Sequence, residues 1–148
     1  MSLQERIESD FIAAYKNKDT DLVAVLRMLK AAAKNRQVDL QRPLTDDEVL
    51  DLVLKQIKQR QESIDMYSKA GRDELAAKEA AELELLRAYQ PQPLSVDELA
   101  KLIKAVVAEQ GATSIKDMGR VIQAIMNTHK GRVDGKAVSE LVRNRLSS

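Results

Sequence analysis

Apolar residues recur along this chain at intervals of three and four positions, the spacing that places side chains on one face of an α-helix. No stretch alternates apolar and polar residues for long enough to indicate a β-strand, and no internal repeat is visible. The sequence therefore predicts an all-α protein. Seven apolar stripes follow one another, at residues 3–14, 22–33, 50–67, 76–86, 99–107, 115–126 and 138–146.

The predicted helices have recognisable ends. A hydroxyl residue three positions before a carboxylate is typical of a capping box at a helix start. Glycine directly after a helix is a favoured C′ residue, and Gly71 and Gly111 follow the third and fifth stripes. Capping boxes are predicted at Ser2–Glu5, Thr45–Glu48, Ser95–Glu98 and, in a variant form, Ser114–Asp117.

Two prolines separate the fourth stripe from the fifth. Pro91 and Pro93 cannot continue a helix, and they stiffen the chain at this point. We therefore expect a four-helix amino-terminal subdomain at residues 1–90, a proline linker at residues 91–93 and a three-helix carboxy-terminal subdomain at residues 94–148.

Composition supports a helical core and suggests a compartment. Of the 148 residues, 44% are hydrophobic, 3% are aromatic and none is cysteine, which excludes disulfides and thiolate metal sites. The amino terminus lacks the apolar core of a signal peptide, and no apolar run is long enough to span a bilayer. We expect a cytoplasmic protein that has no membrane partner.

Charge is unevenly distributed, although the net charge is only +1. Residues 1–93 hold fifteen Lys/Arg against seventeen Asp/Glu, whereas residues 94–148 hold nine against six. Cations, glycines and the single histidine cluster around the junction of the sixth and seventh stripes, and this combination suits an anionic ligand, above all phosphate. The predicted RNA-binding residues are Arg120, His129, Lys130, Gly131, Arg132, Asp134, Gly135 and Lys136, with charge added by Arg143 and Arg145.

Several candidate RNA-contact residues, in this cluster and elsewhere in the chain, also have structural interpretations. Asp134 can cap the last helix, which accounts for the aspartate and for Gly135 but not for the clustered cations. Gly119 lies inside a helix at a cost of about 1 kcal/mol relative to alanine, and we favour a close helix crossing over close approach of RNA as its explanation. Tyr67 and Tyr89 lie on or near apolar stripes, so packing is favoured over base stacking.

A second group of cations lies on the second predicted helix. Arg27, Lys30 and Lys34 are spaced to stack along one face, and this secondary basic face is a further candidate for contact with a phosphate backbone. The alternative, which we favour from sequence, is a solubilising surface paired with acidic neighbours.

The usual catalytic and cofactor motifs are absent from the sequence. His129 is the sole histidine base, and no G-x-S-x-G elbow or S-x-x-K pair supplies a nucleophile. Glu79 and Glu82 share one helix, where we interpret them as a solvated face rather than as metal ligands. Neither a G-x-G-x-x-G nor a Walker-type glycine loop occurs. No catalytic residue, metal site or cofactor is therefore predicted.

Six short motifs stand in a defined order along the chain. They are RMLK at 27–30, YSKAGR at 67–72, YQP at 89–91 leading to LS at 94–95, GA at 111–112, DMG at 117–119 and KGRVDGK at 130–136. Together their order and spacing resemble the YqeY family of small bacterial proteins over nearly the whole length.

Residues 94–148 are also similar to the tail of the B subunit of the tRNA-dependent amidotransferase. That enzyme amidates Glu or Asp already charged on tRNA, with nitrogen from glutamine, and its tail engages tRNA rather than doing chemistry. The resemblance implies an all-helical two-part fold, tRNA contact at residues 130–132 and 134–136, and partners among amidotransferase subunits or an aminoacyl-tRNA synthetase. The segments that activate the acyl group and hydrolyse glutamine have no counterpart in this sequence, so carbon–nitrogen ligase activity with glutamine as amido donor belongs to the larger enzyme.

Three hypotheses follow from the sequence. The leading one is a non-catalytic tRNA-binding module linked to tRNA-dependent amidation. The second is an accessory subunit or enzyme in glutamine-dependent amidation of charged tRNA. The third is a helical scaffold that binds proteins through its amino-terminal helices, for which an exposed apolar stripe is the expected sign.

Overall fold

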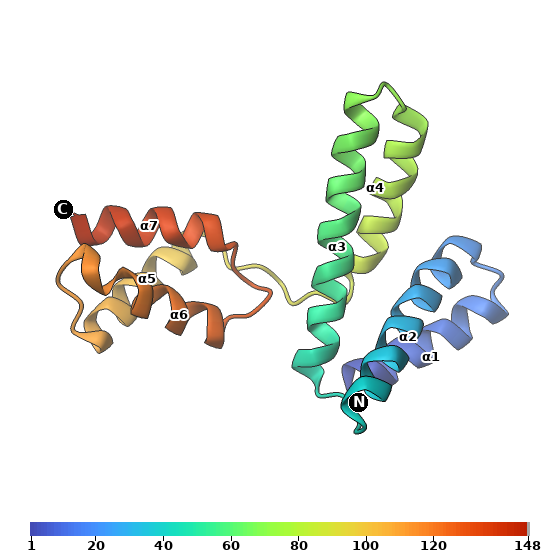
Figure 1. Cartoon of the computed structure of the whole chain (residues 1–148), viewed down its shortest axis with the longest axis horizontal. Helices are drawn as coiled ribbons and strands as arrows, with labels where there is room; N and C mark the ends of the chain where they lie inside the picture. Colours follow the sequence, from blue (N-terminus) through green and yellow to red (C-terminus); the bar gives the residue numbers. More distant parts are fainter. Residues whose placement is uncertain (148) are drawn as a thin grey trace. The chain divides into compact units, whose positions relative to one another are not determined.

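The computed structural model describes residues 1–147, and these form seven α-helices, one short 3₁₀ helix and no β-strand (Figure 1). The all-α prediction is therefore confirmed. Ser148, the last residue of the predicted carboxy-terminal subdomain, lies outside the described residues. The elements are α1 (Leu3–Lys16), α2 (Thr20–Leu40), α3 (Asp46–Lys69), α4 (Asp73–Arg87), α5 (Val96–Gln110), η1 (Ile115–Asp117), α6 (Met118–Thr128) and α7 (Gly135–Ser147).

Two of the predicted capping boxes are complete. The Thr45 hydroxyl accepts a hydrogen bond from the Glu48 N–H, and the Glu48 carboxylate accepts one from the Thr45 N–H at the start of α3. Ser95 and Glu98 form the same pair of bonds at the start of α5. Arg42 donates two hydrogen bonds to the Glu48 carboxylate, and together with the Thr45 N–H it lowers the pKa of Glu48 to about 2.

The other two predicted helix starts have different hydrogen bonds. At α1 the Ser2 hydroxyl accepts from the Glu5 N–H. After Ser114 the chain first makes the 3₁₀ turn, and the Asp117 carboxylate accepts from the backbone N–H groups of Thr113 and Ser114. An α-helix therefore begins after this turn, later than the sixth apolar stripe predicts.

Glycines end α3 and α5, as predicted. Gly71 and Gly111 have φ angles of +72° and +63°, in the left-handed region where an L side chain is strained. These two positions therefore require glycine for the chain to turn away from the helix.

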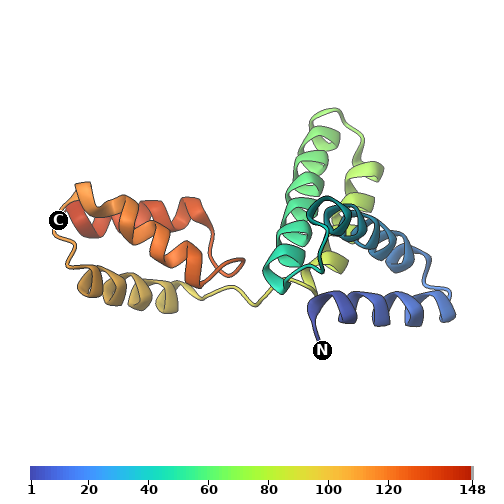
Figure 2. The ribbon, with the colours of Figure 1, turned by 60° about the horizontal axis from the view of Figure 1, so that its bottom comes forward.

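Contacts within the chain group its residues into two compact units, Met1–Gln90 and Pro91–Ser148. In the first unit, α1 and α2 form one antiparallel hairpin and α3 and α4 form another (Figures 1 and 2). Tyr89 is buried in the core that the two hairpins share, which confirms the packing interpretation for this tyrosine. The buried core consists of Ile7, Val25, Leu26, Leu29, Val49, Val53, Ile57, Leu83, Leu86 and Tyr89.

A charged side chain is buried between α3 and α4. Arg60 is 7% exposed, and it forms ion pairs with Glu79 at 3.1 Å and with Glu82. The interpretation of these two glutamates as a solvated face is therefore wrong. Their carboxylates neutralise a guanidinium that is removed from water, which explains why both carboxylates lie toward α3.

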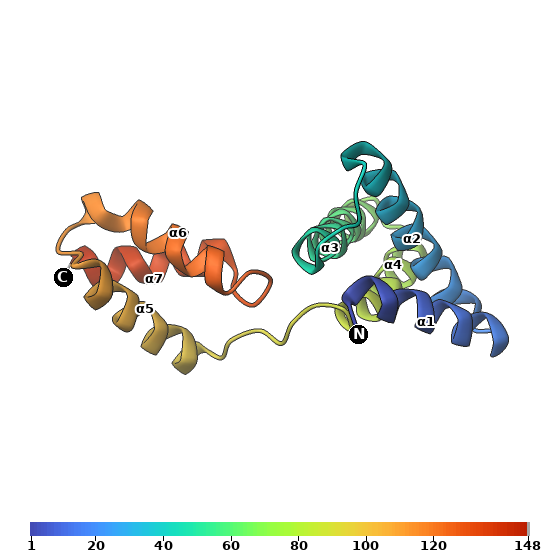
Figure 3. The ribbon, with the colours of Figure 1, turned by 90° about the horizontal axis from the view of Figure 1, so that it is seen from below.

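The second unit packs α5, α6 and α7 around a core of its own (Figure 3). The segment at residues 91–94 is attached to this unit by two hydrogen bonds. The Gln92 carbonyl accepts from Nε of Arg132 at 2.9 Å, and the Leu94 N–H donates to the Arg132 carbonyl at 2.9 Å. The buried core consists of Leu99, Ile103, Val106, Val121, Ile125, Val138, Val142 and Leu146.

No helix within residues 1–147 combines the length and the apolar character that crossing a membrane requires.

Candidate functional site

The loop between α6 and α7 is a compact turn held by its own backbone. The Arg132 N–H donates to the His129 carbonyl at 3.0 Å, which closes the turn. The Asp134 carboxylate accepts from a backbone N–H in the first turn of α7 at 3.3 Å, so the predicted cap is confirmed. The predicted RNA-binding residues of this loop are therefore carried on a defined backbone rather than on a loosely held chain.

The three glycines near this loop serve different purposes. Gly131 has a φ of +77°, so the turn requires glycine there. Gly135 begins α7, and a Cβ added to it would make only an ordinary contact. Gly119 is exposed on α6, and a Cβ added to it would meet no atom within 4 Å. The explanation of Gly119 as a close helix crossing is therefore wrong.

Arg132 contributes to the structure of its own unit. Its side chain is half-buried, and its Nε donates to the carbonyl of Gln92. The pKa of Glu98 is lowered chiefly by hydrogen bonds from Ser95 and also by the positive charge of Arg132. The guanidinium thus joins the loop to the segment that precedes α5, and its contact with RNA stays a prediction.

Arg120 is exposed but engaged in an ion pair. Its Nη2 lies 2.8 Å from Oδ1 of Asp117, one turn earlier in the chain. The pKa of Asp117 is lowered, first by the hydrogen bond from the Thr113 N–H and then by Arg120. An exposed ion pair of this kind contributes little stability, so Asp117 does not prevent Arg120 from reaching another anion.

Lys136 and Arg143 are exposed cations on one face of α7. They are seven positions apart, which places them two turns and about 10 Å from each other. Neither takes part in the ion pairs found among residues 1–147. Lys130 is half-buried, as is His129, whose Nδ1 lies 2.8 Å from the hydroxyl of the preceding threonine. We define Lys136 and Arg143 as the α7 basic pair.

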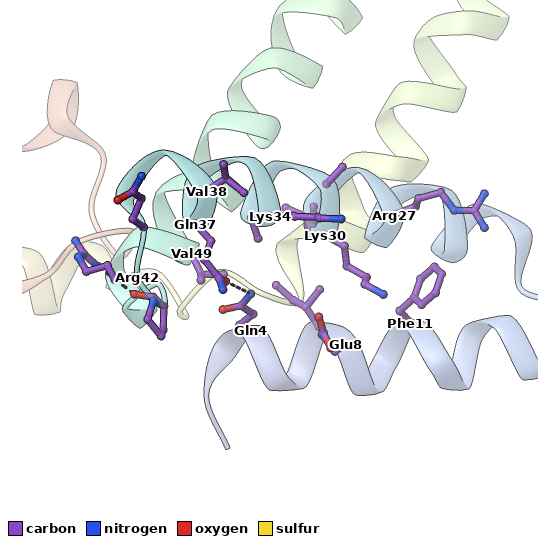
Figure 4. Close-up of a pocket in the computed structure, with 16 residues that line it drawn as sticks. Gln4, Glu8, Phe11, Arg27, Lys30, Lys34, Gln37, Val38, Arg42 and Val49 are labelled. Atoms are coloured by element: carbon purple, nitrogen blue, oxygen red, sulfur yellow. Dashed lines mark hydrogen bonds between the residues drawn. The ribbon is translucent and has the colours of Figure 1, made fainter.

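The predicted secondary basic face forms one wall of a groove between α1 and α2 (Figure 4). The groove has a volume of about 790 Å³. Arg27, Lys30 and Lys34 line it from α2, and the floor is apolar. The floor side chains are Ile7, Leu29, Ala33 and Val49, all of them buried. The wall on α1 is formed by Gln4, Glu8 and Phe11.

Two of the groove cations lie over an aromatic ring. Nζ of Lys30 is 4.2 Å from the centroid of Phe11, and Cζ of Arg27 is 5.9 Å from the same centroid. None of Arg27, Lys30 and Lys34 takes part in the ion pairs found in the described part of the chain. The expected pairing of this row with acidic neighbours is therefore not found.

Sequence reasoning missed the opposite wall of this groove. The apolar stripe of the first helix assigns Phe11 to the core, yet its ring also makes a cation–π contact with Lys30 of α2. Nε2 of Gln4 donates to Oε1 of Gln37 at 3.4 Å across one end of the groove. The signal that was available is the spacing of Gln4, Glu8 and Phe11, which places them on one edge of the helix.

Across the described range no three His, Asp or Glu side chains are arranged so that they could hold a metal ion. Two sets of cations are candidates for binding an anion, each within its own unit. One is the α7 basic pair, and the other is the row of Arg27, Lys30 and Lys34 along the groove.

Comparison with known families identifies the fold family. The family described as "Yqey-like protein" matches residues 4–146 of the chain. The chain belongs to the YqeY family. The resemblance of the six sequence motifs to this family is thereby confirmed.

Three curated relatives share one name, "Altered inheritance of mitochondria protein 41, mitochondrial". The relative from Pyrenophora tritici-repentis is 30% identical over 142 residues, which cover 93% of this YqeY chain and 77% of the relative. The relative from Eremothecium gossypii is 36% identical, with 72% of this chain and 60% of the relative covered. The relative from Saccharomyces cerevisiae strain YJM789 is 28% identical, with 89% and 70% covered. The match thus spans less than two thirds of the Eremothecium protein.

These names correct the localisation inferred from the sequence. All three relatives are named as mitochondrial proteins, so the cytoplasmic prediction is wrong. Its physical basis was too general, because a lack of cysteine indicates at most a reducing environment and does not distinguish one reducing compartment from another.

Proposed function

We propose that this YqeY protein is a non-catalytic tRNA-binding module that acts beside tRNA-dependent amidation. In this proposal α5–α7 form a three-helix subdomain that contacts RNA, and α1–α4 form a separate four-helix subdomain. The observation that carries the proposal is the α7 basic pair, because Lys136 and Arg143 are exposed on one helix face and lie outside the ion pairs of residues 1–147.

The electrostatics of this face support contact with phosphates. Each Lys or Arg that neutralises a phosphate releases condensed counterions, and this release provides most of the affinity of sequence-independent binding. Lys136 lies in the first turn of α7, where the helix dipole also favours an anion. The turn that contains Gly131 precedes this end of the helix and is closed by the hydrogen bond from the Arg132 N–H to the His129 carbonyl.

The similarity of residues 94–148 to the tail of the amidotransferase B subunit supports tRNA as the specific RNA. The tail engages tRNA in that enzyme, and the resemblance implies the same contact at residues 130–132 and 134–136. We accordingly propose amidotransferase subunits or an aminoacyl-tRNA synthetase as protein partners.

Salt-dependent tRNA binding tests the proposal. The full-length chain and the double variant Lys136→Ala/Arg143→Ala are titrated against tRNA at several salt concentrations. The affinity falls as salt rises, so log affinity plotted against log salt has a negative slope. Each lost phosphate contact is expected to reduce the magnitude of this slope by about 0.7–0.9, so the double variant should have a slope that is flatter by roughly 1.5.

A matched variant controls for the loss of net charge. Lys101→Ala/Lys104→Ala removes two exposed cations from α5 of the same unit. This variant should keep most of the slope. Equal slopes for the wild type and the α7 variant, or equal losses in the two variants, would show that the α7 basic pair is not the contact surface.

The link to amidation is tested separately. Purified protein is added to glutamine, ATP and Glu-tRNA, with and without amidotransferase subunits, and formation of Gln-tRNA is measured. We expect the protein alone to yield none and the assembled enzyme to be stimulated. Product from the protein alone would contradict the non-catalytic assignment.

A further inference from the structure

The groove between α1 and α2 combines an apolar floor with a cationic rim. Its floor is buried aliphatic surface, and Val38, which is 65% exposed, extends that surface at one end (Figure 4). The accessible apolar surface of the groove is thus Val38 and part of the Phe11 ring, beside the row of like charges. Such surface is characteristic of a binding groove, because a purely solubilising face has no reason to keep apolar residues accessible.

The rim cations are available to an acidic partner. Lys30 and Arg27 lie against the Phe11 ring, which provides some stabilisation. Glu8 lines the facing wall, but among residues 1–147 it forms no ion pair with them. Arg42, at the end of the groove, is different, because it is held by two hydrogen bonds to the Glu48 carboxylate. The groove therefore has an ion-paired arginine at one end and, along α2, three cations that form no ion pair with the described residues.

We propose that this groove docks an acidic amphipathic α-helix of a partner protein. The apolar face of that helix packs on the accessible apolar side chains of the groove, Phe11, Ala31 and Val38, above the buried floor. Carboxylates on its edge lie against Lys30, Lys34 and Arg27. This interaction surface is independent of the proposed tRNA contact, whose cations belong to the other unit.

The dimensions of the groove fit a short helix. The lining residues on α2 run from Arg27 to Val38, which is eleven positions and therefore about 17 Å of helix. A partner helix of about three turns covers this length. The cations recur at i, i+3 and i+7, so carboxylates at the same spacing on one edge of a partner helix can face all three.

A nucleic-acid strand fits the groove less well. Phosphates would meet the cations, but the aliphatic floor offers no hydrogen-bond partner for the polar edges of the bases, which would lose their water. Phe11 is the one aromatic side chain in the lining, and its ring is already approached by Lys30 and Arg27. A stacking platform of the kind that single strands use is therefore not available here.

A designed peptide tests the proposal directly. The probe is a fluorescent synthetic peptide of about 15 residues, with leucine at i, i+3, i+4 and i+7 and glutamate along one edge of that stripe. A matched peptide carries lysine in place of every glutamate. The full-length protein is titrated into each peptide, and fluorescence anisotropy gives the affinities. We expect the glutamate peptide to bind at least about ten-fold more tightly than the lysine peptide.

Charge reversal in the protein should reverse this preference. Lys30→Glu/Lys34→Glu is expected to weaken the glutamate peptide at least about ten-fold and to strengthen the lysine peptide. Lys55→Glu/Lys58→Glu, on the exposed face of α3 and outside the groove, is the matched control and should leave both affinities unchanged. Circular dichroism checks that each variant is folded. If the double variant fails to fold, Lys34→Glu alone replaces it, because Lys34 is exposed.

Three outcomes would overturn the proposal. One is equal binding of the two peptides by the wild type, and another is an unchanged preference in the groove variant. The third is a groove variant that keeps the peptide preference but loses tRNA affinity, which would assign the groove cations to RNA.

Discussion

The hydroxyl of Tyr89 donates a 2.6 Å hydrogen bond to Oδ2 of Asp10. This bond connects Tyr89, two positions after the end of α4, to the middle of α1, across 79 positions of sequence. Arg6 completes the contact, since its guanidinium lies 4.7 Å from the centroid of the Tyr89 ring and donates to the Ala88 carbonyl at 2.8 Å. The end of the first unit is thereby attached to its beginning.

Because of this bond, the first unit is expected to lose stability at alkaline pH. Burial raises the pKa of Tyr89, and the hydrogen bond to Asp10 raises it further. The folded state therefore favours the neutral hydroxyl. Its contribution is fully present below the unfolded tyrosine pKa of about 10 and is lost as the pH rises above that value.

We expect Tyr89→Phe to lower the free energy of unfolding at pH 8 by about 1 kcal/mol and to reduce the further loss between about pH 10 and 11. Urea unfolding at a series of pH values measures both effects. Tyr15→Phe is the control, because Tyr15 is exposed. An alkaline loss that is the same in Tyr89→Phe and in the wild type would contradict this account.

The buried ion pairs of Arg60 make a second prediction. Arg60→Ala leaves the carboxylates of Glu79 and Glu82 without their partner at the α3–α4 interface, and we expect a loss of about 3 kcal/mol in chemical unfolding. Arg87→Ala removes an exposed partner of Glu84 and should cost less than about 1 kcal/mol. Similar losses in the two variants would show that burial does not distinguish the two arginines.

A substitution at Gly119 tests whether this glycine is kept for RNA binding at a cost in stability. Gly119→Ala is expected to raise the free energy of unfolding by about 0.5–1 kcal/mol, because the position is helical and open. Gly71→Ala, at a φ of +72°, should instead lower it by about 1 kcal/mol. Thermal unfolding compares the two. A stabilised Gly119→Ala that binds tRNA more weakly would support close approach of RNA to this backbone; unchanged affinity would exclude it.

Substitutions at Arg132 and Lys136 are expected to have different effects, the first on stability and the second on tRNA affinity. Arg132→Ala removes the hydrogen bond to the Gln92 carbonyl, and we expect it to cost about 1 kcal/mol and to increase hydrogen exchange at the Leu94 amide. Lys136→Ala should leave stability within about 0.5 kcal/mol of the wild type while reducing tRNA affinity. A stable Arg132→Ala with unchanged exchange would indicate that the contact to Gln92 is dispensable.

The candidate sites show how far local patterns reach. Asp134 was identified as a cap from its position before a helix, because a capping bond forms between residues three apart. The partner of Arg132 was not identified, because Gln92 lies 40 positions away and no local spacing connects them. For the same reason the sequence suggests a solvated face at Glu79 and Glu82, because their partner Arg60 lies on another helix, α3.

The groove shows the same limit on a larger scale. The spacing of Arg27, Lys30 and Lys34 placed them on one face of a helix, which is a property of that helix alone. Their contact with Phe11 and the apolar floor beside them depend on α1 packing alongside α2. A cationic row on an isolated helix is indistinguishable from solubilising surface, and packing makes it the wall of a groove.

The sequence by itself determined the helices, their caps, the glycines that end them and membership of the YqeY family. These features depend on interactions between residues one to four positions apart, or on short motifs that stand in a defined order along the chain. The tertiary structure alone decided which charges are buried, which are paired and which remain exposed, because burial and ion pairing depend on segments that only folding brings together.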